Sequence, residues 1–570
     1  MAIAPVPSRE EIVRLYTAGE LANELARYHT KPGDKADPFV DVCVGLHNDG
    51  DIDLLGVASQ PAFASLGTQD FFTAQRFYCR AIPKLQTTAK PLMLTCRALV
   101  EQAGPDGAAR RPKDAFRIWC ESNRAEADKV IGAARAGDDL ARGFLAFALQ
   151  AADDADRAIE IVRAYDDDRR LSGMAALGAM KFSDATAAHH AIAVLQPFVA
   201  EAGNDRVRMC ALFAAFDILR KHLDAGLART LVDAAARQPG PETLFGLAEV
   251  LWLHHAVLEI ATLRTLLRAL EGLEPDHGRT ISTLDMALPQ LLGKDTEPLA
   301  LDLLTTLIKE RGLKLDDFDT IAHELGNNNP QRQYELTVRW LLSGSHALCR
   351  SAGDFLVLQS KRPFDATAQP LGLTSQQLFF LCRKAIGWLF PYPVACCSII
   401  ISVLRAADTE LSESISELLF DPMLVSYAGE TKAYLESIRA PDSAYGAVRY
   451  ALAKADGFYA DLEAIGVVKE LQPSDYQRDV QRQRSVDQAK EIQKQAESQS
   501  IFLSTGAVHR TVILYGRRSL TYVTGYDGTR QAVEMDLQTI STSWELPRRD
   551  TLDPVGLSYM LRVFQVERMP

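Results

Sequence analysis

The sequence predicts a mainly α fold: an α-solenoid of repeated helical hairpins, a further helical region, a long spacer helix and a small C-terminal β or α+β module. Three observations lead to this prediction. Leucines recur every 35–37 residues through the middle of the chain, the segment from residue 475 to 500 is almost wholly polar without Gly or Pro, and the last 70 residues change from a helical to an alternating pattern.

Size and composition are those of an ordinary globular protein. At roughly 150 residues per domain, the 570 residues suggest about three to four domains, and 47% of the residues are hydrophobic. The 62 Lys and Arg against 74 Asp and Glu give a net charge of −12. An acidic balance disfavours a dedicated nucleic-acid binder, because such proteins need positive charge against the phosphate backbone.

Cysteine usage and hydropathy predict a cytoplasmic protein that does not enter the membrane. The nine cysteines are odd in number and show no C-x-x-C spacing, which is typical of buried, reduced thiols. The N-terminus lacks the basic and apolar pattern of a signal peptide. The most apolar run, Val394 to Leu404, has 11 residues, whereas a membrane-spanning helix needs about 20.

Residues 1–115 predict an irregular helical N-terminal region. Ser8 and Glu11 form a capping-box pattern ahead of an amphipathic helix. Gly, Pro and Asp are frequent from residue 31 to 69, so loops interrupt the helices there. Two further helices are expected over 70–81 and 91–102.

The strongest pattern is a repeat of two interleaved sets of leucines. The first set is spaced by 35, 35 and 37 residues and consists of Leu177, Leu212, Leu247 and Leu284. The second set is spaced by 36, 36 and 37 residues and consists of Leu195, Leu231, Leu267 and Leu304. Two helical families at one period indicate a helix–turn–helix unit repeated along the chain.

The segment Asn204 to Leu212, in which an Asp precedes a Val-Arg pair, resembles the start of the second helix of a HEAT repeat. The resemblance is clearest over 150–345. It implies an α-solenoid over 116–345, in which Asp205 and Arg208 would form part of a ladder between neighbouring units. The other units lack the Val-Arg pair, so the resemblance concerns the architecture and not a specific protein.

Residues 346–471 predict a helical continuation of the solenoid. Helices are expected over 374–390, 393–407, 409–420 and 443–465, each opened by Ser, Thr or Pro. Residues 472–500 then predict one charged helix, about 37 Å long at 1.5 Å per residue. Its sparse apolar positions favour a spacer over the alternative, a dimerising coiled coil.

Residues 501–570 predict a β-meander module. Strands are expected over 511–515, 519–523, 531–537 and 540–546. A hairpin loop at Asp527-Gly528 would pair Tyr522 with Val533 and Leu520 with Met535. Asp553 and Pro554 are typical of a helix start, and we expect the helix that follows, over 557–564, to close this module.

No catalytic, cofactor or metal site is predicted. Asn48 to Asp53 has the alternating acids of a calcium loop but lacks its glycine, and Gly293-Lys294 lacks the remainder of a P-loop. The vicinal His and Cys pairs do not have metal-ligand spacing on a helix. We therefore expect structural roles for these residues.

Arginines and aromatic residues near the C-terminus are the candidate contact residues for a partner. The candidates are Arg517, Arg518, Trp544, Arg548 and Arg549. Arg and Trp are favoured at protein-interface hot spots, and they also stack on nucleic-acid bases. The alternative is that they are ordinary surface arginines around a small core.

Taken together, the patterns favour a non-enzymatic scaffold for protein–protein interaction, or a regulatory subunit of a multi-protein complex. The partner is expected to be a protein, and nucleic acid is disfavoured by the acidic charge. Two alternatives stay open. One is an enzyme with an unrecognised site in the N-terminal or C-terminal region, and the other is a nucleic-acid-binding HEAT-like solenoid.

Overall fold

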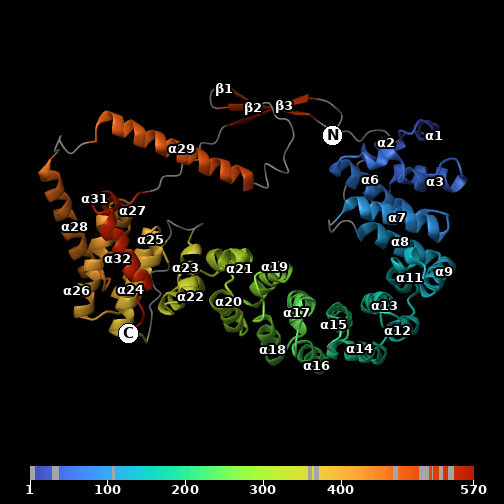
Figure 1. Cartoon of the computed structure of the whole chain (residues 1–570), viewed down its shortest axis with the longest axis horizontal. Helices are drawn as coiled ribbons and strands as arrows, with labels where there is room; N and C mark the ends of the chain where they lie inside the picture. The colour runs from blue at the N-terminus through green and yellow to red at the C-terminus, as the bar shows by residue number, and fades with distance from the viewer. Residues whose placement is uncertain are drawn as a thin grey trace. The chain divides into compact units, whose positions relative to one another are not determined.

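The computed structural model describes residues 7–27, 37–104, 110–201, 203–356, 363–364, 372–466, 473–499, 512–515, 518–524, 530–536 and 545–569. The protein is mainly α-helical, and the described strands form one sheet (Figure 1). Its contacts divide it into two compact units, Met1–Asn329 and Pro330–Pro570, which are described separately below.

The first unit begins with a group of short and medium helices. They are α1 (Arg9–Thr17), α2 (Leu21–Arg27), α3 (Pro38–Asp49), α4 (Leu54–Val57), α5 (Pro61–Ala64), α6 (Thr68–Ala81) and α7 (Ala89–Ala103). The helices predicted over 70–81 and 91–102 are confirmed as α6 and α7. Tyr78 of α6 is fully buried and donates a hydrogen bond of 2.7 Å to the carbonyl of Leu54, which joins α6 to α4.

The helices that follow are arranged in pairs in chain order. They are α8 (Arg111–Ser122), α9 (Arg124–Arg135), α10 (Asp139–Arg142), α11 (Leu145–Ala152), α12 (Ala155–Ala164), α13 (Asp167–Ala179), α14 (Ala185–Ala200), α15 (Asp205–Leu219), α16 (Ala225–Ala235), α17 (Pro241–His254), α18 (Ile260–Leu270), α19 (Gly278–Ala287), α20 (Glu297–Arg311) and α21 (Asp319–Asn328). Figure 1 shows them following one another as a row of pairs.

Alternate helices contact each other along this row. Helix α13 packs on α15, α15 on α17 and α17 on α19, while α12, α14, α16, α18 and α20 form a second series of neighbours. All eight leucines of the predicted repeat are buried. The eight predicted helices are therefore present, and each contributes one of these leucines to the core.

Aspartate or asparagine begins five consecutive helices of the row. In each case the side chain accepts a hydrogen bond from a backbone N–H in the first turn, which satisfies a group that the helix leaves unpaired. These N-cap residues are Asp154, Asp166, Asp184, Asn204 and Asp224. The polar turns that separate the leucine-rich segments thus fix where each helix begins.

Several α-helices of the second unit lie among its described residues before 466. They are α22 (Pro330–Leu342), α23 (His346–Asp354), α24 (Ser375–Leu389), α25 (Pro393–Leu404), α26 (Thr409–Leu418), α27 (Glu430–Glu436) and α28 (Tyr445–Ile465). The four helices predicted in this region are confirmed as α24, α25, α26 and α28. Every residue of α25 is buried, so the most apolar run of the sequence forms part of the core of this unit.

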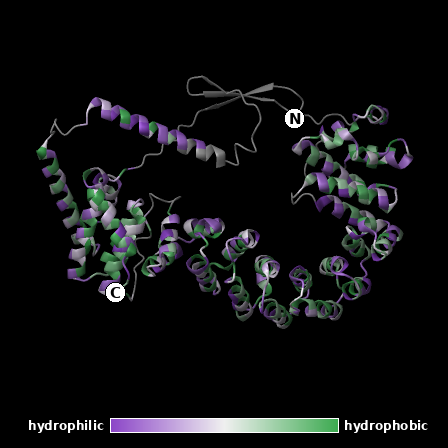
Figure 2. Cartoon of the chain, viewed as in Figure 1, coloured by the Kyte–Doolittle hydropathy of each residue, from purple (hydrophilic) through white to green (hydrophobic). Residues whose placement is uncertain are grey.

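Helix α29 (Asp475–Gln499) is the charged helix that the sequence predicts. Figure 2 shows it as predominantly hydrophilic along its length. Tyr476 and Val486 are its exposed large apolar residues among those whose side chains are described. Over the side chains described, α29 has no continuous apolar stripe on which another helix could pack firmly.

The strands among the described residues are β1 (Val512–Tyr515), β2 (Arg518–Thr524) and β3 (Arg530–Asp536), paired antiparallel in the order β1-β2-β3. The predicted register of β2 and β3 is wrong by one residue, because Tyr522 pairs with Ala532 and Leu520 with Glu534. The paired ends Thr524 and Arg530 enclose five residues, whereas a two-residue loop at Asp527-Gly528 requires an even number between paired residues. Most of the fourth predicted strand lies outside the described residues.

The C-terminal helices are α31 (Arg548–Leu552) and α32 (Pro554–Val566). Asp553 caps α32 through the N–H of Gly556 at 2.9 Å, as predicted. The expectation that this helix closes the β module is wrong, because α32 packs on α24. The two backbones approach closely at Gly387, where an added Cβ would lie 3.0 Å from the Cβ of Phe564.

Candidate functional site

Asp205 links two successive helix pairs. From the first residue of α15 its carboxylate accepts hydrogen bonds from the N–H groups of Glu242 and Thr243, at 2.7 and 3.3 Å, at the start of α17. Gly240 leaves the space for this contact, since an added Cβ would lie 2.5 Å from the carboxylate. A negative charge at a helix N-terminus is favourable, so Asp205 both caps and orients α17.

Arg208 lies one turn further along α15 and binds backbone carbonyls on both sides. Its guanidinium donates to Val199 at 2.8 Å, Gln238 at 2.7 Å, Ala234 at 2.6 Å and Ala235 at 3.0 Å. The carbonyls of Val199, Ala234 and Ala235 lie at the C-terminal ends of α14 and α16, where helices leave acceptors unpaired, and that of Gln238 lies in the turn after α16. The side chain is buried, and burial lowers its pKa from the ordinary arginine value.

An equivalent pair one unit earlier was not among the predicted residues. Asp167 accepts a hydrogen bond of 2.9 Å from the side chain of Asn204, and Arg170 donates to the carbonyls of Val162 and Tyr165 at 3.0 and 2.9 Å. Asp167 and Arg170 have the same Asp-x-x-Arg spacing as Asp205 and Arg208. That spacing is the signal that would have identified them.

A hollow of about 470 Å³ lies between α19 and the turn that precedes α21. Asp285 is buried there and accepts hydrogen bonds from the N–H groups of Thr320 and Ile321 at 2.9 and 3.0 Å. This contact links α19 to α21 in the way that Asp205 links α15 to α17. The middle of a helix carries no local signal for such a cap, so sequence reasoning missed it.

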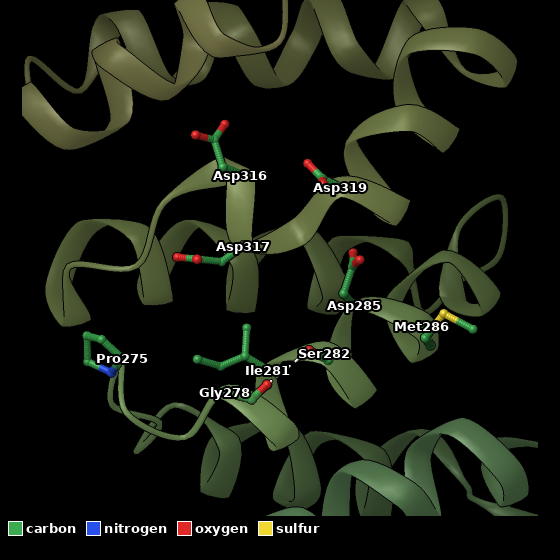
Figure 3. Close-up of a pocket in the computed structure, with 9 residues that line it drawn as sticks. All are labelled: Pro275, Gly278, Ile281, Ser282, Asp285, Met286, Asp316, Asp317 and Asp319. Atoms are coloured by element: carbon green, nitrogen blue, oxygen red, sulfur yellow. Dashed lines mark hydrogen bonds between the residues drawn. The ribbon is translucent and has the colours of Figure 1, made fainter. Parts of the chain in front are cut away.

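Three further carboxyl groups line the same hollow (Figure 3). Asp316 and Asp317 belong to the short helix η5 (Leu315–Phe318), and Asp319 begins α21. Burial raises the pKa of Asp319, and the neighbouring charges of Asp285 and the other two carboxylates add to this rise. The hollow is therefore lined by four carboxyl groups.

The predicted contact arginines at 548 and 549 are used within the second unit. The Arg549 guanidinium forms an ion pair with Asp421, and its side chain is only 15% exposed. The Arg548 guanidinium lies 5.1 Å from the ring centre of Tyr459 on α28. Both side chains thus attach the start of α31 to the helices of their own unit.

The other predicted contact residues can be placed only in part. Arg518 is the first residue of β2 and pairs with Asp536 on β3. Arg517 and Trp544 lie outside the described residues. Their role as partner contacts stays a prediction.

Glu545 is an attachment point that sequence reasoning missed. Its two carboxylate oxygens accept hydrogen bonds from the N–H groups of Gly429 and Glu430, at 2.8 and 2.9 Å, at the start of α27. An added Cβ at Gly429 would lie 2.9 Å from this carboxylate. The contact joins residues more than one hundred positions apart, so nothing in the local sequence indicates it.

Lys384 of α24 is a fully buried cation at the contact between α24 and α32. Its ammonium group donates a hydrogen bond of 2.7 Å to the carbonyl of Gln565, and the Gln565 side chain donates to the carbonyl of Gly387 at 2.7 Å. Burial lowers the pKa of Lys384. Arg383 forms an ion pair with Glu567, which completes the polar contacts at the C-terminal end of α32.

Seven of the nine cysteines are buried, and Cys79 and Cys210 are half-buried. All nine cysteines are free, and burial raises the pKa of the neighbouring Cys396 and Cys397 thiols. Over the described ranges, no group of three or more His, Cys, Asp or Glu side chains has the geometry to hold a metal ion. None of the helices described is both long and apolar enough to span a bilayer.

Comparison with known proteins finds no matching family model, no matching curated protein and no matching solved structure.

Proposed function

We propose that the protein is a scaffold for protein–protein interaction, or a regulatory subunit of a multi-protein complex, built on a HEAT-like α-solenoid over 116–345 that continues through 346–471. One observation carries the proposal. Alternate helices from α11 to α19 and from α12 to α20 contact one another in two continuous series. Stacked helical pairs of this kind expose a long surface that compact domains do not have.

The bonds between successive pairs support a rigid surface. Asp205 of α15 caps α17, and Arg208 of α15 binds the ends of α14 and α16. Neighbouring helix pairs therefore cannot rotate independently without breaking hydrogen bonds to charged groups. Such bonds are worth about 1.5–3 kcal/mol each. A surface that keeps its shape before binding loses less conformational entropy when a partner binds.

The chemistry of the first unit favours a partner with a basic segment. The chain carries a net charge of −12, and the hollow beside α19 gathers Asp285, Asp316, Asp317 and Asp319. Opposite charges speed association and fix the register of two proteins. We place the contact with a Lys or Arg side chain of the partner at this hollow.

The β strands are a second contact in this proposal, with Arg517 and Arg518 as the charged groups at the connection between β1 and β2. Helix α29 is the spacer that carries them.

We place the protein in the cytoplasm because its nine cysteines are unpaired, as is usual in a reducing compartment.

The experiment compares two full-length variants that each lose two negative charges. Asp316→Asn with Asp319→Asn removes charge from the hollow, and Glu410→Gln with Glu413→Gln removes it from exposed positions of α26. Each variant and the wild type is used for quantitative affinity purification from cell extract, with the captured proteins identified by mass spectrometry.

We expect the hollow variant to capture at least fivefold less of a defined set of basic partners than the wild type does, while the α26 variant captures them in unchanged amounts. The loss should diminish at high salt, since salt screens exposed charges. Equal capture by both variants would show that the hollow is not the contact. A wild type that captures no protein above the background of an unrelated bait would overturn the proposed function itself.

A further inference from the structure

Helix α32 lies beside α24 in the second unit and runs antiparallel to it (Figure 1). The contacts between the two helices give this direction. Gly387, near the end of α24, lies against Phe564, whereas Gln377, near the start of α24, donates to the sulfur of Met569 at 3.7 Å. The C-terminal part of α32 and the residues just after it are therefore the part that α24 binds.

The surface of α24 under α32 has the chemistry to bind the C-terminal end of a helix. Lys384 donates a hydrogen bond of 2.7 Å to the carbonyl of Gln565 in the last turn of α32, where helix carbonyls lack a partner within the helix. A positive charge at this end is also favourable because of the helix dipole. The Gln565 side chain donates to the carbonyl of Gly387 at 2.7 Å, and Arg383 forms an ion pair with Glu567.

The segment just before α32 is fixed by contacts that do not involve α24. Glu545 accepts two hydrogen bonds from the start of α27, and Arg549 forms an ion pair with Asp421. Asp553 separates α31 from α32 with non-helical backbone angles of φ −151° and ψ 74°. A change at Asp553 would therefore move α32 off α24 while residues 545–552 stay in place.

Helix α32 buries little apolar surface, and its contact with α24 leaves charged groups incompletely paired. All residues of α32 are described, and Leu557 alone is buried. Lys384 is fully buried, and its ammonium group, which has three N–H donors, makes one hydrogen bond to α32. The Nε atom of Arg383 and one carboxylate oxygen of Glu567 are buried without a hydrogen-bond partner. Water would reach these groups if α32 left, which offsets part of the contact.

We propose that α32 is a detachable strap that lifts from α24 at Asp553, and that the surface it uncovers binds the C-terminal turn of a partner helix. The partner helix carries a Gln two residues before a Glu, as Gln565 and Glu567 do. In the closed state, α32 competes with that helix and inhibits its binding. The existence of a partner rests on the proposed scaffold function, whereas the movement of α32 does not. We expect an open state populated on the order of 1%.

The first measurement is the fluorescence anisotropy of a labelled synthetic peptide of residues 553–569, titrated with the full-length protein. Leu557→Asp with Gln565→Ala, the strap variant, weakens the chain's own strap and leaves α24 unchanged. At an effective concentration of about 1 mM, an open fraction of about 1% gives a Kd on the order of 10 µM for this variant. The wild type should bind the peptide about a hundredfold more weakly, because its surface is free in about 1% of the molecules.

The matched control is Ser558→Asp with Tyr559→Ala, because both residues are exposed on α32 and the change in charge is the same. This variant should bind the peptide as weakly as the wild type. Lys384→Met added to the strap variant should weaken peptide binding at least tenfold, because the cation that binds the carbonyl of Gln565 is lost. Circular dichroism checks that each variant is folded.

The second measurement is hydrogen–deuterium exchange of the wild type, which needs no substitution. A helix of 13 residues is marginal alone in water, so α32 should exchange whenever it lifts. An open fraction of about 1% predicts exchange about a hundredfold slower than in an unfolded peptide, at a rate that low concentrations of urea do not change. The fully buried helix α25 should exchange at least a hundredfold more slowly than α32.

Exchange of α32 and α25 at one common rate would overturn the strap, because α32 would then leave only when the unit unfolds. Equal affinities of the strap variant and the wild type for the peptide would overturn the competition. Peptide binding that survives Lys384→Met would overturn the surface assigned to the partner helix. None of these outcomes involves the hollow of the first unit, so the proposed scaffold function is tested separately by its own experiment.

Discussion

Replacing Arg208 with alanine should open the structure locally around α16 and α17. The substitution removes four hydrogen bonds to carbonyls at and just after the ends of two helices. The Ala234 carbonyl keeps a hydrogen bond from the N–H of Arg237, so three acceptors lose their partner. An unsatisfied buried acceptor costs about 1 kcal/mol at the lower limit, so the total is about 3 kcal/mol. The stability of the rest of the chain should change little, because each helix pair contacts mainly its neighbours.

Hydrogen–deuterium exchange of the full-length protein measures this local effect. A loss of about 3 kcal/mol corresponds to exchange up to roughly 150-fold faster in peptides that cover 225–254, provided that the opening free energy there is at least this large. Peptides of α24 and α25 serve as the internal reference. The exchange rate of Arg208→Lys should lie between those of the wild type and Arg208→Ala, because an ammonium group cannot reach four carbonyls from one position.

Arg206→Ala is the matched control. Arg206 lies two residues away on the same helix and is exposed, so its removal should leave the exchange rates close to those of the wild type. If Arg208→Ala and Arg206→Ala exchanged within twofold of each other over 225–254, the argument that Arg208 joins neighbouring helix pairs would be refuted.

Two further predictions concern packing and pH. Gly387→Ala should destabilise the α24–α32 contact by about 1–3 kcal/mol, because its Cβ would lie 3.0 Å from that of Phe564. Limited proteolysis should then release C-terminal peptides faster, whereas Gly457→Ala, where no atom lies within 4 Å, should not have this effect. Burial lowers the pKa of His254 from 6.5 to about 4, so the folded state favours the neutral ring. The stability that this provides is complete above pH 6.5 and is lost as the pH falls toward 4, and His254→Gln should flatten the dependence of the urea midpoint over that window.

The sequence predicted those parts of the fold that depend on periodic burial. Leu212 and Leu247 recur at the repeat period because each occupies the same place in the core of its helix pair, and a period is visible in a single sequence. The helix starts at Ser8 and Asp553 were predicted for a similar reason, since an N-cap side chain acts on its own first turn.

Contacts between residues far apart in the sequence could not be predicted, because no periodic or local pattern indicates them. Lys384 and Gln565 are 181 positions apart, and neither lies in a pattern that indicates the other. The β2–β3 register was wrong because it depends on how many residues the connection encloses, and the side-chain alternation fitted a two-residue loop equally well. Arg548 and Arg549 were predicted as contact residues from their chemistry, but the sequence did not reveal that Tyr459 and Asp421 of the same chain contact them.

Because residues 545–569 pack on the helices of the second unit, the segment between Ile465 and Glu545 is attached to that unit at both of its ends. Those 79 residues leave the helical unit at the end of α28 and return to it at α27, so they form an insertion attached at both ends and not a free tail. Holding both ends in place costs conformational entropy, which the contacts of Glu545, Arg549 and α32 offset. A molecule that binds the second unit would therefore meet the strands at a high effective concentration, and a single cut within the insertion would lower that concentration while α32 stays attached through its own contacts.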